Sequence, residues 1–486
     1  MRGFRRRRRL WRDKAGGEEK IKKGGWNAQK SFSLLPRITS KFYRRDFMYN
    51  ILDYGAVGDG VTKNTAVIQR AIDECGAAGG GRVIVPAGRF LSGTLYLRDY
   101  VELHLESSNS VLIASPDFDD YNPPDVFPQN AAWPHEEMNG GHFIMAVETV
   151  GNSITGFGTI DGSGHSFFTG ELEFCPLEEY CFWPDGFSII ADKKRMRPGQ
   201  MVYFYECRDV RIQDVVMCNT PFWTLLVHGC ENVQIRGIRI QNERTALNSD
   251  GIDIDCCTNV TVSDCIIETG DDAIAIRGDN EMLKHDRACE YITISNCVIA
   301  SYGANAIRVG VGSGTIRNVL INNMIFKDSV CGMHFQSKYW TRAAVKGTEI
   351  TNVQVQNVRG TNIKIPFFIN SGFDADDRIR DILFDNYCCD TEHTAAFIGN
   401  NFTKPDNIRF NNVQLNVTGQ APAWAHHEVD CSQYGTHMHS LDCVVYFANV
   451  KDVELNNFRI NYIKRGDGWK HDMIIHPTAD VKINNN

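Results

Sequence analysis

A short phrase recurs along most of the chain and limits what the chain can fold into. It consists of a polar pair, then Val or Ile, then alternating residues, and often Asn or Asp. Its Val or Ile returns after 23, 27, 32, 27, 34, 29, 26 and 45 residues, a spacing typical of stacked repeats. These anchors are Val210, Val233, Val260, Ile292, Val319, Val353, Ile382, Ile408 and Val453.

Each repeat predicts strands and turns and almost no helix. Its short alternating runs are rich in Val, Ile and Phe and are broken by Gly, Asn and Asp. One unit cannot bury its apolar side alone, whereas stacked units bury a continuous core. The pattern therefore predicts an all-β protein, a parallel β-helix (solenoid) whose turns lie about 4.8 Å apart. Propeller blades carry Trp-Asp or Gly-His marks and leucine-rich repeats carry a Leu ladder, so both fit less well.

One short helix is expected near the start of the patterned sequence. Asn64 or Thr65 can cap the segment TAVIQRAIDEC, and Gly76 can end it. The open end of a solenoid exposes apolar core, so a capping element is structurally required there. We expect residues 49–486 to form a single β-helix domain, in which the patterned sequence ends near residue 470.

Charge separates the first residues from the rest of the chain. Residues 1–47 carry 16 Lys and Arg against 4 Asp and Glu, whereas the remainder carries 35 against 55. The unpatterned basic stretch predicts a disordered or non-native leader, with Met48 as the natural start. The acidic remainder argues against nucleic acid as a partner. Apolar runs fall far below the roughly 18 residues of a membrane-spanning helix, so no membrane partner is expected.

Two further features bear on location and cofactors. No apolar signal segment follows the arginines of the leader, which predicts a cytoplasmic protein. The neighbouring pairs Cys256/Cys257 and Cys388/Cys389 suit disulfides poorly and no CxxC pair exists, so we expect reduced, mostly buried thiols. A late group of histidines lacks zinc spacing, so neither a metal nor a cofactor is expected. This group is His426, His427, His437 and His439.

The strand that ends each middle turn can be aligned with its neighbours. The segments WTLLV, DGIDI, DAIAI, NAIRV and CGMHF share one pattern, in which the third and fifth residues are apolar and are predicted to face the core. The first residues then form one column, and the fourth residues form an outward column beside it. The first column is Trp223, Asp250, Asp272, Asn305 and Cys331, and the second is Leu226, Asp253, Ala275, Arg308 and His334.

Three acids converge in this alignment: Asp250, Asp271 and Asp272. Taken singly, each Asp suits the turns of any β-helix, where it satisfies backbone amides. As a cluster, like charges a few ångströms apart raise at least one pKa, so that one carboxyl group stays protonated near neutrality and can donate a proton. Trp223, one turn away, offers a platform for a sugar ring. Paired carboxylates on a groove suit glycoside hydrolysis.

The acids lie in two motifs. NSDG at Asn248–Gly251, followed by GDD at Gly270–Asp272, resembles the NTDG and GDD motifs of the polygalacturonase family, glycoside hydrolase family 28. The resemblance covers residues 49–360, and the paired Asp motifs are its specific part. Supporting matches are LDYGAVGDGVTKNT from Leu52, GGGRVIVPAGRF from Gly79, GTIDGSG from Gly158 and NTPFWTLLV from Asn219.

The resemblance implies a right-handed parallel β-helix and an inverting hydrolase that requires no metal. Carried over by motif, Asp271 protonates the leaving glycosidic oxygen, while Asp250 and Asp272 activate the attacking water. Asn248 supports the cluster by hydrogen bonding. An inverting pair leaves room for the water, with roughly 6.5–9.5 Å between acid and base.

Two departures from the family bear on the substrate. The family's GHG motif aligns with residues 304–306, so that Asn305 replaces its histidine. Its RIK motif aligns with residues 334–336, so that His334 and Gln336 replace the two cations that grip a galacturonate carboxylate. Acids retained without that clamp indicate altered substrate choice more than a dead enzyme. Without a cation the groove favours a neutral sugar.

Arg308 is the candidate for compensation, since the outward column places it between Ala275 and His334. Its guanidinium group is suited to bidentate binding of a uronate carboxylate. The alternative is a structural ion pair with Asp253 or a neighbouring acid. The other candidates for substrate binding are Asn248, Asn305, His334, Gln336, Trp223, Arg277, Lys338 and Tyr339.

An aromatic and acidic insertion at residues 171–187 interrupts the repeat and predicts a loop that walls the groove, which favours action at chain ends. The sequence therefore predicts an inverting, exo-acting glycosidase of pectin-derived, galacturonide-containing or related oligosaccharides and polysaccharides. Two alternatives stay open. One is a uronate lyase, with a Lys or Arg base and calcium held by the acids. The other is a noncatalytic carbohydrate-binding β-helix, suggested by the lost histidine and cations.

Overall fold

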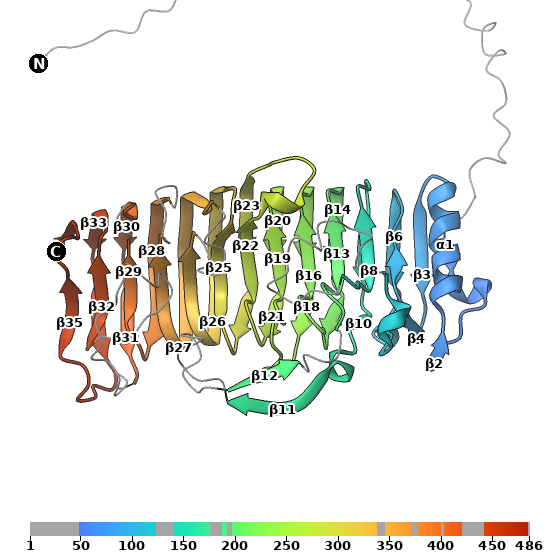
Figure 1. Cartoon of the computed structure of the whole chain (residues 1–486), viewed down its shortest axis with the longest axis horizontal. Helices are drawn as coiled ribbons and strands as arrows, with labels where there is room; N and C mark the ends of the chain where they lie inside the picture. The colour runs from blue at the N-terminus through green and yellow to red at the C-terminus, as the bar shows by residue number, and fades with distance from the viewer. Residues whose placement is uncertain are drawn as a thin grey trace, which may run out of the picture. The chain divides into compact units, whose positions relative to one another are not determined.

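The alternating runs of the repeats form three stacks of parallel strands. The computed structural model describes residues 48–122, 140–174, 187–191, 197–337, 346–371, 378–399, 403–419 and 442–484. These residues belong to one compact unit, Phe47–Asn486. Within it, successive turns of the chain lie side by side, and each strand pairs in parallel with strands of the turns before and after (Figure 1). The fold is therefore a parallel β-helix, as predicted.

The first stack contains the anchors of the repeat. The anchors pair with one another along the whole series from Val210 to Val453, so the unequal sequence steps are one turn each. The strands of this stack are β1 (Met48–Asn50), β3 (Gly81–Val85), β6 (Val101–Leu105), β9 (Ser153–Gly156), β14 (Arg208–Gln213), β17 (Glu231–Arg236), β20 (Thr258–Ser263), β23 (Cys289–Ser295), the first parts of β26 (Thr315–Gln336), β27 (Glu349–Asn370) and β28 (Ile379–Thr391), then β30 (Asp406–Asn411), β33 (Lys451–Asn456) and β36 (Val481–Asn484).

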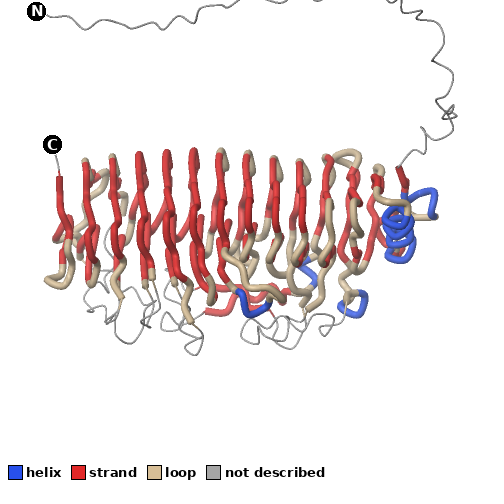
Figure 2. Tube along the Cα trace, turned by 90° about the horizontal axis from the view of Figure 1, so that it is seen from above, coloured by secondary structure: helices blue, strands red, loops and turns tan. Residues whose placement is uncertain are grey.

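The other two stacks complete each turn (Figure 2). The second is β2 (Asp59–Lys63), β4 (Gly88–Ser92), β7 (Ser110–Ala114), β10 (Thr159–Asp161), β15 (Val216–Cys218), β18 (Arg239–Gln241), β21 (Ile266–Thr269), β24 (Val298–Ser301), later parts of β26, β27 and β28, β31 (Gln414–Val417) and β34 (Arg459–Tyr462). The third, which we call the site stack, is β5 (Leu95–Tyr96), β8 (Ile144–Val147), β13 (Val202–Tyr205), β16 (Leu225–His228), β19 (Ile252–Asp255), β22 (Ile274–Gly278), β25 (Asn305–Gly312), the ends of β26 and β27, β29 (Ala395–Ile398), β32 (Cys443–Ala448) and β35 (His471–Ile475).

Inward side chains of all three stacks form one continuous hydrophobic core. Asn and Asp hold the corners between strands, because these residues tolerate a left-handed backbone better than other non-glycine residues. Asn357, for example, has φ 54°. Its side chain donates to Asn322 Oδ1 at 2.9 Å and accepts from Asn386 Nδ2 at 2.7 Å, so neighbouring turns are joined by a ladder of amides. The Asn and Asp of the recurring phrase are therefore corner residues.

The helix expected near the start is present as α1 (Thr65–Ala77), at one end of the described turns (Figure 1). Its buried residues Ile68, Ala71, Ile72 and Cys75 belong to the hydrophobic core. Asn64 lies at the N-cap position, but its side chain makes no capping hydrogen bond and is bonded instead to the backbone of Val57 and Thr62. That α1 is required to cap the open end of the solenoid stays a prediction.

The remaining elements are short. The chain also forms η1 (Ile51–Tyr54), η2 (Phe118–Asp120), η5 (Gly164–Ser166) and η6 (Asn280–Met282). The strands β11 (Phe168–Phe174) and β12 (Phe187–Ala191) form a separate antiparallel hairpin at the insertion, of which residues 175–186 lie outside the described ranges. The loop that was predicted to wall the groove therefore remains a prediction.

Several predictions from composition meet the fold here. The cysteines in the described ranges are all free, and most are buried. None of the helices in those ranges has the length and apolar character needed to cross a membrane. The leader at residues 1–47, the late group of histidines, Lys338 and Tyr339 lie outside the described residues.

Candidate active site

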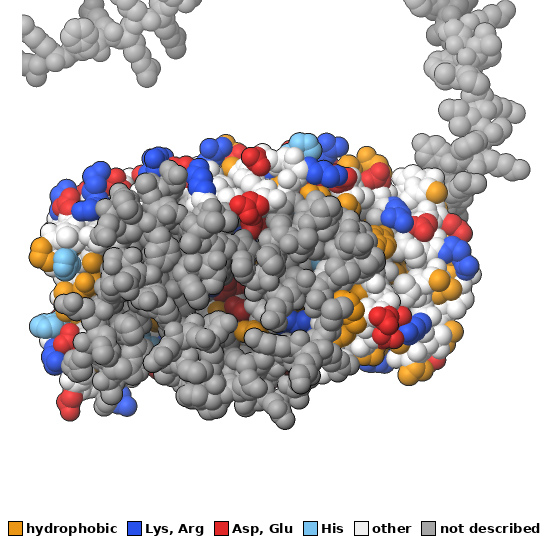
Figure 3. Space-filling view, viewed as in Figure 1, with side chains coloured by type: hydrophobic (Ala, Val, Ile, Leu, Met, Phe, Trp, Pro, Cys, Tyr) orange, Lys and Arg blue, Asp and Glu red, His pale blue; other side chains and the backbone are white. Residues whose placement is uncertain are grey.

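The site stack carries the two columns that the alignment predicts. Leu226 pairs with Asp253, Asp253 with Ala275, Ala275 with Arg308, and Arg308 with His334. The apolar residues between them, such as Ile252 and Ile274, are fully buried in the core. Alternation along each strand therefore sends the polar residues to the outer face of this stack. In the view of Figure 3, acidic side chains are visible over the central turns.

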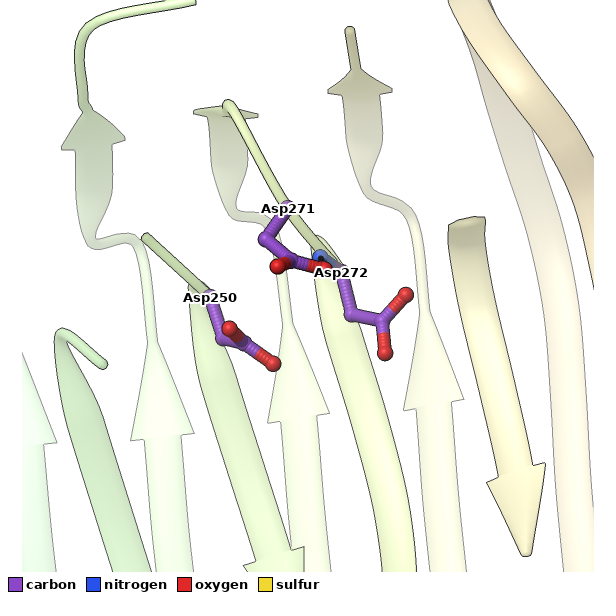
Figure 4. A group of neighbouring side chains, drawn as sticks. All are labelled: Asp250, Asp271 and Asp272. Atoms are coloured by element: carbon purple, nitrogen blue, oxygen red, sulfur yellow. Dashed lines mark hydrogen bonds between the residues drawn. The ribbon is translucent and has the colours of Figure 1, made fainter. Parts of the chain in front are cut away.

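The three acids meet at the start of two neighbouring strands. Asp250 precedes β19, and Asp271 and Asp272 precede β22 (Figure 4). The Gly251 N–H donates to the Asp272 carbonyl at 2.9 Å, which locks the two motifs in register. A Cβ atom at Gly251 would lie 2.4 Å from the Ala273 carbonyl oxygen, so the glycine of the first motif is required for this close approach. The spacing of the two motifs therefore reflects one turn of the solenoid.

The nearest carboxylate oxygens of the three acids lie closer together than the separation expected between the carboxyl groups of an inverting pair. Each of Asp250, Asp271 and Asp272 offers a carboxylate oxygen, and these atoms lie within 4.8 Å of one another. The expected range was roughly 6.5–9.5 Å. The physical reason is the stacking itself, because residues that begin adjacent strands are held about 4.8 Å apart.

Asp272 is held by donors on both of its oxygens. Arg308 Nε forms a buried ion pair with Oδ2. Both the backbone N–H, at 3.2 Å, and the side-chain amide of Asn305 donate to Oδ1. Arg308 Nη1 also donates to Gln336 Oε1 at 3.1 Å. Of the two possibilities for Arg308, the structure thus shows an ion pair with a neighbouring acid, Asp272.

Asp271 is the half-buried member of the cluster. Burial and the neighbouring Asp272 charge raise the pKa of Asp271 to about 6, against lowering by Arg308 and by two backbone hydrogen bonds. These bonds come from the Asp272 N–H at 2.9 Å and the Asn248 N–H at 3.2 Å. Asn248 therefore supports the cluster by hydrogen bonding, as the resemblance implies, and does so through its backbone N–H at φ 54°.

Asp250 is a buried carboxyl group, 3% exposed. Burial, followed by the charges of Asp271, Asp253 and Asp272, raises its pKa well above the usual value. Its Oδ1 atom has no hydrogen-bond partner among the described residues. The cluster thus combines a proton-holding carboxyl group, a carboxyl group with a pKa near 6, and a carboxylate fixed by an arginine. Such pairs with different environments perform acid and base chemistry in one site.

The same oxygens are close enough to hold a divalent cation. Two observations favour proton transfer by the cluster over cation binding. Arg308 already neutralises Asp272, and burial raises the pKa of both other acids, which favours their protonated forms. Cation binding would require those protons to leave.

Trp223 and Arg277 lie beside the acids, but they contact each other. The Arg277 guanidinium lies 4.2 Å from the Trp223 ring centroid. The Phe222 ring stacks on the Trp223 ring, with centroids 5.4 Å apart. Arg277 also lies 3.7 Å from Asp253 and 3.8 Å from Asp255. Trp223 is 2% exposed, so it packs in a cluster where an open sugar platform was expected.

His334 is buried and uncharged. Its ring stacks on Phe368 with centroids 5.1 Å apart. Burial, reinforced by the nearby Arg308 charge, lowers the pKa of His334 well below its usual value. The outward column therefore contains one guanidinium, that of Arg308, and no second cation at the neighbouring turn.

Sequence reasoning missed Arg197. This buried side chain donates from Nη2 to Asn248 Oδ1 at 2.6 Å and from Nη1 to the Leu247 carbonyl at 2.9 Å, while its guanidinium lies 4.5 Å from the Phe222 ring centroid. It thereby holds the segment that supplies an N–H to Asp271. Arg197 lies in an irregular segment before the first aligned turn, so no repeat position pointed to it.

Known proteins share both the fold and the sequence pattern. A probable polygalacturonase from Vitis vinifera is 27% identical over 338 residues, which cover 67% of this chain and 63% of that protein. An exo-poly-alpha-D-galacturonosidase from Dickeya chrysanthemi is 27% identical over 64% of this chain and 55% of that protein. The chain spans about three fifths of the length of the curated relatives that it matches.

A solved structure, the family 28 exopolygalacturonase of Yersinia enterocolitica, superposes with a TM-score of 0.61 at 20% identity and covers 90% of this chain and 78% of that one. This likeness shows the fold. The model of the family described as glycosyl hydrolases family 28 matches residues 75–433, which is most of the chain and includes all three acids. The chain therefore belongs to glycosyl hydrolases family 28.

Proposed function

We propose that the protein is an inverting glycoside hydrolase that cleaves galacturonide-containing oligosaccharides or polysaccharides derived from pectin. The observation that carries this proposal is the half-buried Asp271, whose pKa is raised to about 6 and which lies between Asp250 and Asp272. A general acid must hold its proton near the working pH and still reach the substrate. The family membership and the names of the curated polygalacturonases support the substrate class.

In this mechanism Asp271 donates its proton to the glycosidic oxygen as the bond breaks. A water molecule attacks the anomeric carbon, and its proton passes to Asp272, because the raised pKa of Asp250 favours the protonated form of that carboxyl group. The Asp272 carboxyl group is fixed in place by Arg308 and Asn305, so it is oriented for a water molecule without side-chain movement.

The experiment is incubation with oligogalacturonides and with a panel of neutral and mixed oligosaccharides. New reducing ends without ultraviolet absorbance would establish hydrolysis, and loss of the signal in Asp271→Asn would tie it to this site. Proton NMR of the first product would show an inverted anomer. A retained anomer would overturn the inverting mechanism and leave hydrolysis standing.

We propose that cleavage occurs at chain ends. The insertion at residues 171–187 and the similarity to the exo-poly-alpha-D-galacturonosidase of Dickeya and the exopolygalacturonase of Yersinia support this mode. A time course on long galacturonan would release only mono- or disaccharide at first. An early ladder of intermediate lengths would instead indicate internal cleavage.

A uronate lyase is the second candidate, because the three carboxylates could hold a cation. Its base would be a neutral Lys or Arg, and both arginines on the described outer face of the central turns contact carboxylates. Each elimination would create a double bond that absorbs in the ultraviolet. The same assay therefore separates the two reactions, while binding without turnover would indicate a noncatalytic protein.

A further inference from the structure

We propose that the sugar unit bound over Asn305 and Gln336 is a neutral one, recognised through its hydroxyl groups and not through a carboxylate. This inference rests on the proposed function and names the class of sugar at one position of the same site. It concerns the side of the acids formed by β25 and the end of β26.

The positive charge of Arg308 is already paired with a carboxylate of the protein. Its guanidinium joins the Asp272 carboxylate through Nε and Gln336 Oε1 through Nη1, and the side chain is 9% exposed. A uronate carboxylate that approached Arg308 would compete with Asp272 for the same cation. Separating a buried ion pair leaves an uncompensated charge inside the protein, which is strongly unfavourable.

Each of the side-chain amides of Asn305 and Gln336 has one end that these contacts do not use. Asn305 uses its amide N–H to bind Asp272, so its carbonyl end remains. Gln336 uses its carbonyl end to bind Arg308, so its N–H₂ end remains. The Asn305 Oδ1 and Gln336 Nε2 atoms are buried and have no hydrogen-bond partner among the described residues. The charged neighbours fix which end of each amide is left.

The two unused amide ends are complementary to a sugar hydroxyl group. One remaining atom accepts and the other donates, and a sugar hydroxyl group does both. A carboxylate only accepts, so it would pair with Gln336 Nε2 but face the lone pairs of Asn305 Oδ1. Buried polar groups without partners are costly, so a ligand that satisfies both atoms gains more than one that satisfies one.

The residues around Asn305 and Gln336 also bear on the charge of the bound sugar. The outer face of the central turns carries Asp253 and Asp255 beside Arg277, in addition to the three clustered acids. His334, the nearest ring on the outward column, is held neutral by burial. His334 therefore adds no positive charge that would attract a carboxylate to this side of the acids.

The test compares three size-matched oligosaccharides at a fixed pH at which free uronates are ionised. They are an oligogalacturonate, its methyl ester, and an oligosaccharide in which galacturonate alternates with a neutral sugar. We expect kcat/KM on the ester or the alternating substrate to exceed that on the ionised substrate by about tenfold or more. Gln336→Lys places a cation at the position and should reduce this preference by about tenfold. Gln234→Lys is the matched control, since Gln234 lies exposed on β17, and its preference should equal that of the unchanged protein.

Binding provides a second readout that does not depend on turnover or on the folding of Gln336→Lys. Calorimetry with Asp271→Asn should show tighter binding of the uncharged ligands. Equal or stronger binding and cleavage of the fully ionised substrate would overturn the inference and leave the proposed function intact. Failure to cleave any substrate would overturn the proposed function, and the calorimetric ranking would still decide the nature of the bound sugar.

Discussion

The central and C-terminal turns of the site stack have the same interior and opposite exteriors. In β22 and β29 alike, inward residues such as Ile274 and Phe397 are fully buried. On the outer face, the column runs from Asp253 and Arg308 to Phe368 and Ala396, which belong to a separate apolar cluster. The change occurs within one turn, where His334 stacks on Phe368. The repeat thus sets the fold through one half of its residues and leaves the other half free to set the chemistry.

The largest effect is expected from the outer face of the central turns. Asp271→Asn removes the proton donor and should lower kcat by about 10³-fold. The matched control is Asp264→Asn, because Asp264 is an exposed corner residue with φ 59° paired to Arg236, and its loss should leave kcat unchanged. Equal losses in both variants would mean that the acids serve only the corners.

The free energy of unfolding also tests whether Asp271 is a proton donor or only a corner residue. The pKa of Asp271 is raised from 3.8 to about 6 in the folded protein, so the stability present below pH 3.8 is lost as the pH rises through about 6. Asn does not ionise and keeps that stability. At pH 8 the free energy of unfolding of Asp271→Asn should therefore exceed that of the unchanged protein by about 1–3 kcal/mol, as measured by denaturant titration. A destabilised variant would contradict the raised pKa.

Inward residues should behave alike in the two regions. Phe410→Ala removes a ring that stacks on Phe384 with centroids 4.9 Å apart, and Ile294→Ala empties a buried position in a central turn. The expected losses of unfolding free energy are about 3–5 kcal/mol for Phe410→Ala and about 2–4 kcal/mol for Ile294→Ala. The specific activity of the protein that remains folded should not change. A loss of activity at Ile294 without loss of stability would break the division between interior and exterior.

The sequence predicts the interior well because it repeats. Spacing of Val and Ile determines the register of strands, so the anchors and the columns of Asp250 and Arg308 could be placed from the chain alone. Contacts between side chains on the outer face could not, because they depend on lengths and directions that alternation does not encode. The ion pair of Arg308 with Asp272, the packing of Arg277 on Trp223 and the support from Arg197 are contacts of this kind.

A smaller effect should appear in the pH profile. The kcat/KM of the unchanged protein should fall above pH of about 6, where Asp271 loses its proton. Arg308 lowers the pKa of Asp271, so Arg308→Gln should move this descending limb to higher pH by about one unit. Arg317→Gln removes an exposed ion pair with Glu290 and serves as the control. An unmoved limb would mean that Arg308 acts only on structure.

The smallest effect is expected at the corners, which both regions share. Asn259 in a central turn has φ 60° and donates to Asn232 Oδ1 at 3.2 Å, and Asn357 in a C-terminal turn has φ 54°. Alanine at either position loses the amide ladder and tolerates the left-handed backbone poorly, at an expected cost of about 1–2 kcal/mol. Glycine restores the backbone freedom but not the ladder, so Asn→Gly should cost less than Asn→Ala. Similar losses at Asn259 and Asn357, with kcat unchanged, would show that the corner is a property of the repeat and not of the site. A loss of kcat confined to Asn259 would instead mean that the corner of a central turn positions the acids, and the division between scaffold and chemistry would then have to be drawn between turns as well as between faces.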